Sequence, residues 1–167
     1  TANNNTAIGT ASLGSNTTGA QNTAVGAAAA DAITTGAGNT ALGYASLGDN
    51  TTGGYNVALG SRTLSATSTA SNNVAVGYGA LAADTTGYYN AALGTSALGY
   101  NTTGNLNTAV GGAALATNTT TNGNTAIGYF ALYDNVGTEN TAVGAYAGQN
   151  ISTGSYNCAF GYTAANE

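Results

Sequence analysis

Residues 39–55, NTALGYASLGDNTTGGY, decide the fold because this stretch returns with small changes along the whole chain. Asn, Ala and Gly hold its first, third and fifth places in every copy, and successive copies start 17 residues apart. One interval, from Asn124 to Asn140, is 16, because the usual N-T-T-G has become N-V-G-T at residues 135–138. Such a period is typical of a repeat protein. Numbered from their first Asn as positions 1–17, the copies begin at residues 5, 22, 39, 56, 73, 90, 107, 124, 140 and 157.

The period predicts an all-β parallel β-solenoid (β-roll) of about ten 17-residue coils, forming a single repeat domain over residues 1–167. Helical solenoids need about 33 residues or more per repeat. Frequent Gly and β-branched Thr, Val and Ile also disfavour helix. We expect one strand at positions 2–5, a second at positions 7–10, and corners at the position-5 Gly and the N-T-T-G segment, where Gly permits turn conformations.

Strand alternation places the side chains of positions 2 and 4 on one face and the Ala of position 3 on the other. We expect positions 2 and 4 to fill the interior and the Ala to lie outside, against the backbone of further copies. The alternative is that Ala fills a very thin coil and the larger residues face neighbouring chains. Either way an apolar stripe is left exposed on a monomer, which predicts a homo-oligomer. The expected core ladder is Ile8, Val25, Leu42, Leu59, Val76, Leu93, Val110, Ile127, Val143 and Phe160, and the close-packing Ala are Ala7, Ala24, Ala41, Ala58, Ala75, Ala92, Ala109, Ala126, Ala142 and Ala159.

Asn at position 1 predicts a structural ladder, since stacked amides donate and accept from coil to coil. Acceptor patterns for glycosylation, N-x-[S/T], recur in the turns, and we interpret them as structural. The single cysteine, Cys158, replaces Thr or Val and is expected to be a small core side chain, with a reactive thiol as the alternative. The predicted ladder is Asn5, Asn22, Asn39, Asn56, Asn73, Asn90, Asn107, Asn124, Asn140 and Asn157, and the acceptor patterns begin at Asn16, Asn50, Asn101, Asn118 and Asn150.

The string N-T-A-V-G-x-x-A-L, with N-T-T-G between copies, resembles repeats in tail-fibre-like proteins of phages and bacteria. Its core is also similar to the N-S-V-A-I-G-x-x-S repeat in the heads of trimeric autotransporter adhesins. The resemblance covers Asn5 to about Ala165 and implies a left-handed β-roll in a three-chain bundle. The period here is longer than in those heads, so handedness and trimer rest on the resemblance alone.

Composition excludes several classes of function. Charged residues make up 4% of the chain, against roughly a quarter in ordinary domains, and the net charge is -5 with Arg62 as the one cation. We therefore expect no nucleic-acid partner and no membrane insertion. Because the chain has no His and no Lys, we expect no enzyme, no metal site and no cofactor. A calcium site at residues 49–50 or 134–135 is the weaker alternative to solvated turn acids.

The expected function is that of a non-catalytic structural or adhesive fibre segment, extracellular, on a cell surface or virion. Its partners would be copies of itself and a cell-surface or glycan receptor. Tyr beside the turns could stack on sugars, but packing between chains is the preferred interpretation. One alternative is a self-polymerising filament subunit whose coils stack end to end. A further alternative is an ice- or crystal-surface binder that uses the stacked Thr of positions 13 and 14.

Overall fold

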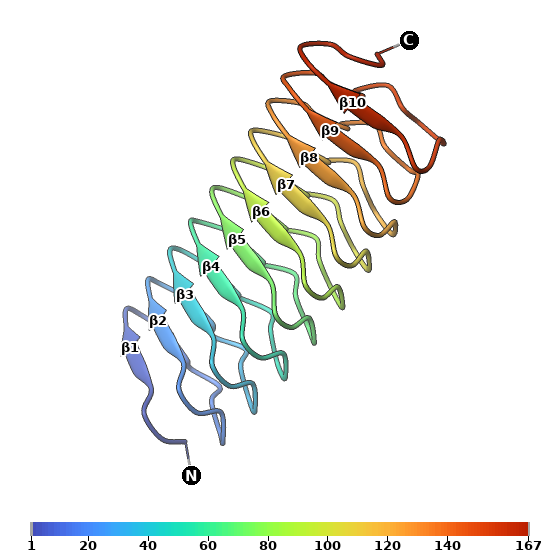
Figure 1. The fold of residues 1–167 in the computed structure, drawn as a ribbon. Helices are drawn as coiled ribbons and strands as arrows, with labels where there is room; N and C mark the ends of the chain where they lie inside the picture. The colour runs from blue at the N-terminus through green and yellow to red at the C-terminus, as the bar shows by residue number, and fades with distance from the viewer. Residues whose placement is uncertain (1, 167) are drawn as a thin grey trace.

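Each copy of the repeat contributes one short strand, and ten strands stack in chain order into one parallel sheet (Figure 1). The computed structural model describes residues 2–166, which contain no helix. Equivalent positions pair in register, as Ala41 does with Ala58. The predicted all-β parallel β-solenoid of about ten 17-residue turns is confirmed. The strands are β1 (Thr6–Ile8), β2 (Thr23–Val25), β3 (Thr40–Leu42), β4 (Val57–Leu59), β5 (Val74–Val76), β6 (Ala91–Leu93), β7 (Thr108–Val110), β8 (Thr125–Ile127), β9 (Thr141–Val143) and β10 (Cys158–Phe160).

The coils form a rod with the two chain ends at opposite ends (Figure 1). Nine steps of about 4.8 Å between neighbouring strands span about 43 Å. Each coil is bonded to its neighbouring coils through the backbone, so the rod is held along its whole length by inter-coil hydrogen bonds.

The second strand expected at positions 7–10 is absent from the described coils. Positions 7 and 9 both have positive φ, for example Ala45 at 50° and Leu47 at 55°. A strand needs negative φ throughout, so this alternation curls the segment into turns. Its backbone groups still bond between coils: the Ala45 N–H donates to Ala27 O at 3.0 Å and the Leu47 N–H to Thr63 O at 2.9 Å. Left-handed non-Gly residues each cost about 1 kcal/mol or more, which these inter-coil bonds and the burial of Leu must offset.

The Gly at position 5 ends each strand in a conformation that other residues avoid. Gly43 has φ 134°, and a Cβ there would lie 2.6 Å from the carbonyl oxygen of Gly60 in the next coil. Both the conformation and the close approach require Gly. The expected corner at this position is therefore present, and the strand is the three residues before it.

The interior is lined by small residues from the sheet and by Leu from the opposite wall. Ala41 at position 3, Ser46 at position 8 and Leu47 at position 9 are all fully buried. The same positions form the continuous hydrophobic core from coil to coil. From Ala24 to Ala159 the position-3 Ala expected outside are thus inside, while Ala7 in the terminal strand β1 is exposed, and the thin-coil alternative is the correct one.

The 16-residue coil absorbs its deletion in the turn, as a repeat structure tolerates best. Asn135 Nδ2 donates to Gly137 O two residues ahead, where the equivalent bond in other coils spans three. The Asn140 N–H still donates to Asn124 Oδ1 at 2.9 Å. The stacking of strands therefore continues through the deletion from β8 to β9.

Candidate functional site

The residues that were expected to form the core lie on the outer face of the sheet, where five of the ten are exposed and the other five are half-buried. Ile8 is 59% exposed, Leu93 50% and Phe160 66%. The prediction of an interior position-4 ladder is therefore wrong for the single chain. The physical reason is the width of the coil: Leu47 and its equivalents fill the space beneath the sheet, which leaves room only for the methyl group of Ala.

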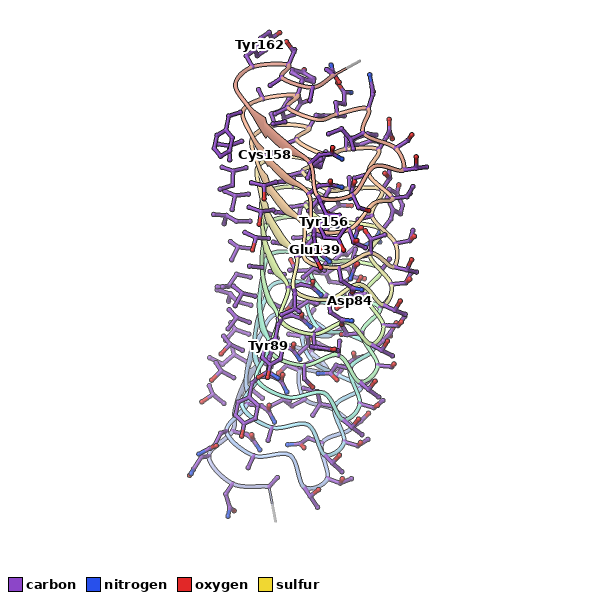
Figure 2. All side chains as sticks on the ribbon, turned by 45° about the vertical axis from the view of Figure 1, so that its right-hand side comes forward. Asp84, Tyr89, Glu139, Tyr156, Cys158 and Tyr162 are labelled. Carbon is purple, nitrogen blue, oxygen red and sulfur yellow. The ribbon has the colours of Figure 1, made fainter. Side chains whose placement is uncertain are left out.

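Two parallel rows of side chains cover this sheet face along the rod (Figure 2). Position 4 supplies Val, Ile, Leu and Phe, and position 2 supplies Thr in six strands and Val, Ala or Cys in the others. No charged residue lies at either position in β1–β10. Cys158 begins β10 in the position-2 row and is exposed, so its expected place in the core is corrected. We call these two rows the sheet face.

Position-1 Asn side chains form a ladder inside the rod. Asn56 accepts on Oδ1 from the Asn73 N–H at 3.0 Å, and its Nδ2 donates to Ala70 O in its own coil at 2.8 Å. The Asn56 N–H in turn donates to Asn39 Oδ1 at 2.9 Å. Asn56 and Asn73 are fully buried. The amides are thus used in stacking and in closing each coil, which leaves them no role at the surface.

A second polar ladder lies at position 12, the Asn of N-T-T-G. Asn50 is fully buried, donates to Gly53 O at 3.0 Å and accepts from the Gly53 N–H at 2.8 Å. Asn101 and Asn118 are buried in the same way, so these acceptor patterns serve the turn in the folded rod. Since Asp49 is exposed while the Asn50 amide is inside, the two do not converge as calcium ligands. Residues 2–166 hold no group of three or more His, Cys, Asp or Glu side chains suited to a metal ion.

Asp84 replaces the position-12 Asn in one coil and is fully buried. Its Oδ1 accepts from the Gly87 N–H at 3.0 Å and from Asn101 Nδ2 at 3.2 Å, and its Oδ2 accepts from Asn73 Nδ2 at 3.4 Å. Burial raises the pKa of Asp84 from 3.8 to about 7, and these donors lower it only in part. Asp84 therefore changes its charge near neutral pH inside the core.

The stacked Thr of positions 13 and 14 differ in their surroundings. Position-13 hydroxyls donate to the carbonyl of the next coil, as Thr34 Oγ1 does to Thr51 O at 3.1 Å and Thr85 Oγ1 to Thr102 O at 2.9 Å. Position 14 forms an exposed rank, including Thr52 and Thr103, whereas the position-13 Thr are half-buried except for Thr17 and Thr119. A single rank of hydroxyls at a corner forms a line. Binding to an ice face would require hydroxyls that match the ice lattice in two dimensions.

Aromatic side chains gather on the wall formed by positions 6, 7 and 10 in the last coils. Tyr129 contacts Phe130 with ring centroids 4.5 Å apart and Tyr146 at 5.6 Å. Tyr146 contacts Tyr162 at 6.1 Å, and Phe130 stacks on Tyr133 at 4.7 Å. These rings pack against one another within one chain. The Tyr of position 17 lie away from them and are exposed; the side chain of Tyr156, for example, is 76% exposed.

Comparisons with protein-family models, with curated proteins and with solved structures found no match. The class follows from the fold itself: the chain is a parallel β-solenoid repeat protein with coils of about 17 residues. Within residues 2–166, no helix is long and apolar enough to cross a membrane. The sequence analysis preferred an inward position-4 row, and its alternative, in which Ala fills a thin coil and the larger residues face outward, is the arrangement in the structure.

Proposed function

We propose that this chain is a non-catalytic structural segment of an extracellular fibre that associates with copies of itself through the sheet face. The observation that supports the proposal is an uncharged, largely aliphatic strip on the outer face along the full length of the rod, whose position-4 residues are exposed or half-buried. A rod of about 43 Å with two rows of side chains about 10 Å wide presents roughly 400 Å² in projection. That is as large as the biggest apolar patch of a typical monomer, and such patches commonly mark interaction sites.

The regular register of the sheet face favours another copy as the partner. Each strand pairs in register with the next, so the two rows repeat at a constant step along the rod. A second copy has the same step and the same apolar rows, so its side chains can interdigitate along the full length. The resemblance to adhesin heads favours three copies around one axis, with the sheet faces turned inward.

The remaining features suit a fibre and offer little for catalysis. The inter-coil backbone bonds and the buried position-1 Asn ladder hold each coil to its neighbours, and a position-12 Asn such as Asn50 closes the turn of its own coil. The titratable side chain with a perturbed pKa, Asp84, is fully buried and bonded within the rod. An extracellular location on a cell surface or virion follows from the resemblance to fibre and adhesin repeats.

The test is the mass of the assembly in solution, measured by light scattering after size-exclusion chromatography. The wild type is expected at a multiple of 16.0 kDa. Leu42→Glu combined with Leu93→Glu buries two charges at the contact and is expected to give the single-chain mass. The matched control, Thr52→Glu with Thr103→Glu, adds the same charges to the same two coils at exposed position 14 and should leave the mass unchanged.

Two results would contradict the proposal. A wild-type chain that runs at 16.0 kDa at all concentrations would remove self-association. A control variant that dissociates as fully as the Leu variant would show that added charge, and not the sheet face, controls assembly. Far-UV circular dichroism of both variants checks that the solenoid is retained.

A further inference from the structure

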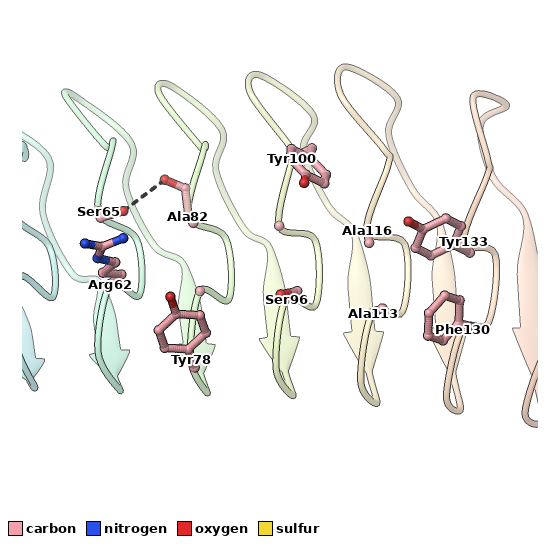
Figure 3. A pocket seen from close by; sticks show the side chains of 12 residues that line it. Arg62, Ser65, Tyr78, Ala82, Ser96, Tyr100, Ala113, Ala116, Phe130 and Tyr133 are labelled. Carbon is pink, nitrogen blue, oxygen red and sulfur yellow. Dashed lines mark hydrogen bonds between the residues drawn. The ribbon is translucent and has the colours of Figure 1, made fainter.

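A groove runs along the rod on the wall opposite the strands, across five consecutive coils (Figure 3). It has a volume of about 490 Å³. Its residues come from positions 6, 7, 10 and 11, so they lie far from the sheet face in every coil. The lining is Arg62, Ser65, Tyr78, Gly79, Ala82, Ser96, Gly99, Tyr100, Ala113, Ala116, Phe130 and Tyr133.

Bulky side chains close the two ends of the groove, and small ones form its floor. Arg62 and Tyr78 lie at one end, and the stacked pair of Phe130 and Tyr133 lies at the other (Figure 3). Between them positions 7 and 10 are Gly, Ala or Ser in three successive coils. Tyr100, 62% exposed, stands beside the middle of the floor. The result is a trough about three coils, or roughly 15 Å, long, with aromatic rings at both ends and one beside its middle.

The backbone of the floor is already paired, which excludes one common class of ligand. The Ser96 N–H donates to Tyr78 O at 2.9 Å, and the Ala113 N–H donates to Thr95 O at 2.9 Å. The Tyr100 N–H donates to Ala116 O at 3.0 Å. A peptide that adds as a strand needs an open row of donors and acceptors, and here those groups are used between coils. Recognition in this groove must therefore come from side chains.

We propose that this groove binds a short oligosaccharide that carries a single carboxylate, with the carboxylate at Arg62. Aromatic rings offer flat apolar surfaces to sugar rings, and the hydroxyls of Tyr100, Tyr133 and Ser96 offer hydrogen-bond partners to sugar hydroxyls. Arg62 is the one cation in a chain of net charge -5. It can pair with one carboxylate, whereas a polyanion such as nucleic acid would be repelled by the rest of the chain. The inference adds a ligand-binding site to the proposed fibre segment and is independent of its self-association.

The experiment measures binding of the intact chain to immobilised trisaccharides, with 3′-sialyllactose as the carboxylated probe and chitotriose as the neutral one. Ala113→Phe is designed to fill the trough and should lower binding by about tenfold or more, since it blocks ring stacking. Position 7 accepts this residue, because Phe130 has the same repeat position with φ 56° against 55° at Ala113. The matched control is Ala45→Phe, at the same position outside the groove with φ 50°, which should bind like the wild type.

Further variants separate the outcomes. Tyr100→Ala removes an exposed ring and should weaken both probes without unfolding, so the proposal remains testable if Ala113→Phe fails to fold. Arg62→Ala should abolish the preference for 3′-sialyllactose over chitotriose. The proposal is overturned if the wild type binds neither probe, or if Ala113→Phe binds as well as Ala45→Phe. It is also overturned if Ala113→Phe changes the assembly mass instead of sugar binding, because the groove would then be a contact between copies.

Discussion

Replacing Asp84 with Asn is expected to stabilise the solenoid at neutral pH and to have little effect near pH 4. Asp84 is fully buried between two Asn amides, and burial raises its pKa to about 7. Asn is the residue that most coils carry at this position. At Asn50 the amide nitrogen donates to Gly53 O, a bond that an ionised carboxylate oxygen cannot make. The substitution therefore removes a buried charge and restores a donor.

The size of the effect follows from the difference in pKa between the folded and unfolded chain. Below pH 3.8 both forms of the chain hold the Asp84 proton, and no stability is lost. Between pH 3.8 and about 7 the unfolded chain releases the proton while the folded chain keeps it, so stability falls as pH rises. At about 1.4 kcal/mol per pKa unit, the loss reaches about 4 kcal/mol at pH 7 and stays constant above it.

The assay is urea denaturation followed by far-UV circular dichroism at pH 4 and at pH 7, at one protein concentration. The stability difference between Asp84→Asn and the wild type should be near zero at pH 4 and about 4 kcal/mol in favour of the variant at pH 7. Asp49→Asn, at an exposed acid, controls for the change in net charge and should show no such dependence. A variant less stable than the wild type at pH 7 would refute the reasoning, because the surrounding donors would then be stabilising the carboxylate.

Two further predictions test the closeness of the coils and the direction of the side chains. Gly94→Ala forces φ 138° on a residue with a Cβ and places that atom 2.5 Å from Gly111 O, so we expect a loss of about 3 kcal/mol or more in thermal or urea unfolding. Gly79→Ala, with φ 65° and its nearest neighbour at 3.8 Å, should cost only about 1 to 2 kcal/mol, and equal losses at the two sites would contradict the tight stacking at position 5. Leu98→Ala, in the core, should cost about 2–5 kcal/mol, whereas Leu93→Ala, on the outer face of the same coil, should cost about 1 kcal/mol or less in the dissociated chain. The reverse order would place position 4 inside.

The repeat and the class of fold could be predicted from the sequence because they depend on local and periodic properties. A 17-residue period is too short for helix pairs, and the Gly at position 5 signals a corner. Stacking of equivalent residues follows from the period alone, which places Asn56 above Asn39 and makes an amide ladder the natural arrangement. These features require no knowledge of how wide the coil is.

The turns at positions 7–10 could not be predicted from residue types. Ala45 and Leu47 have positive φ, a conformation that Ala and Leu rarely adopt and that their local preferences disfavour. It is stabilised by bonds to the coils on either side, which send the two N–H groups in opposite directions along the rod. The groove on this wall also depends on which side chains the turns bring together from five coils.

The sequence by itself determined that the chain is a parallel β-solenoid of about ten coils, with two alternating sets of side chains on each strand. Alternation separates Ala41 from Leu42 but does not say which of them lies inside. Only the closed coil decided that, because Leu47 from the opposite wall occupies the space beneath the sheet and leaves room for a methyl group alone. The aliphatic row was thereby placed on the outer face of the rod.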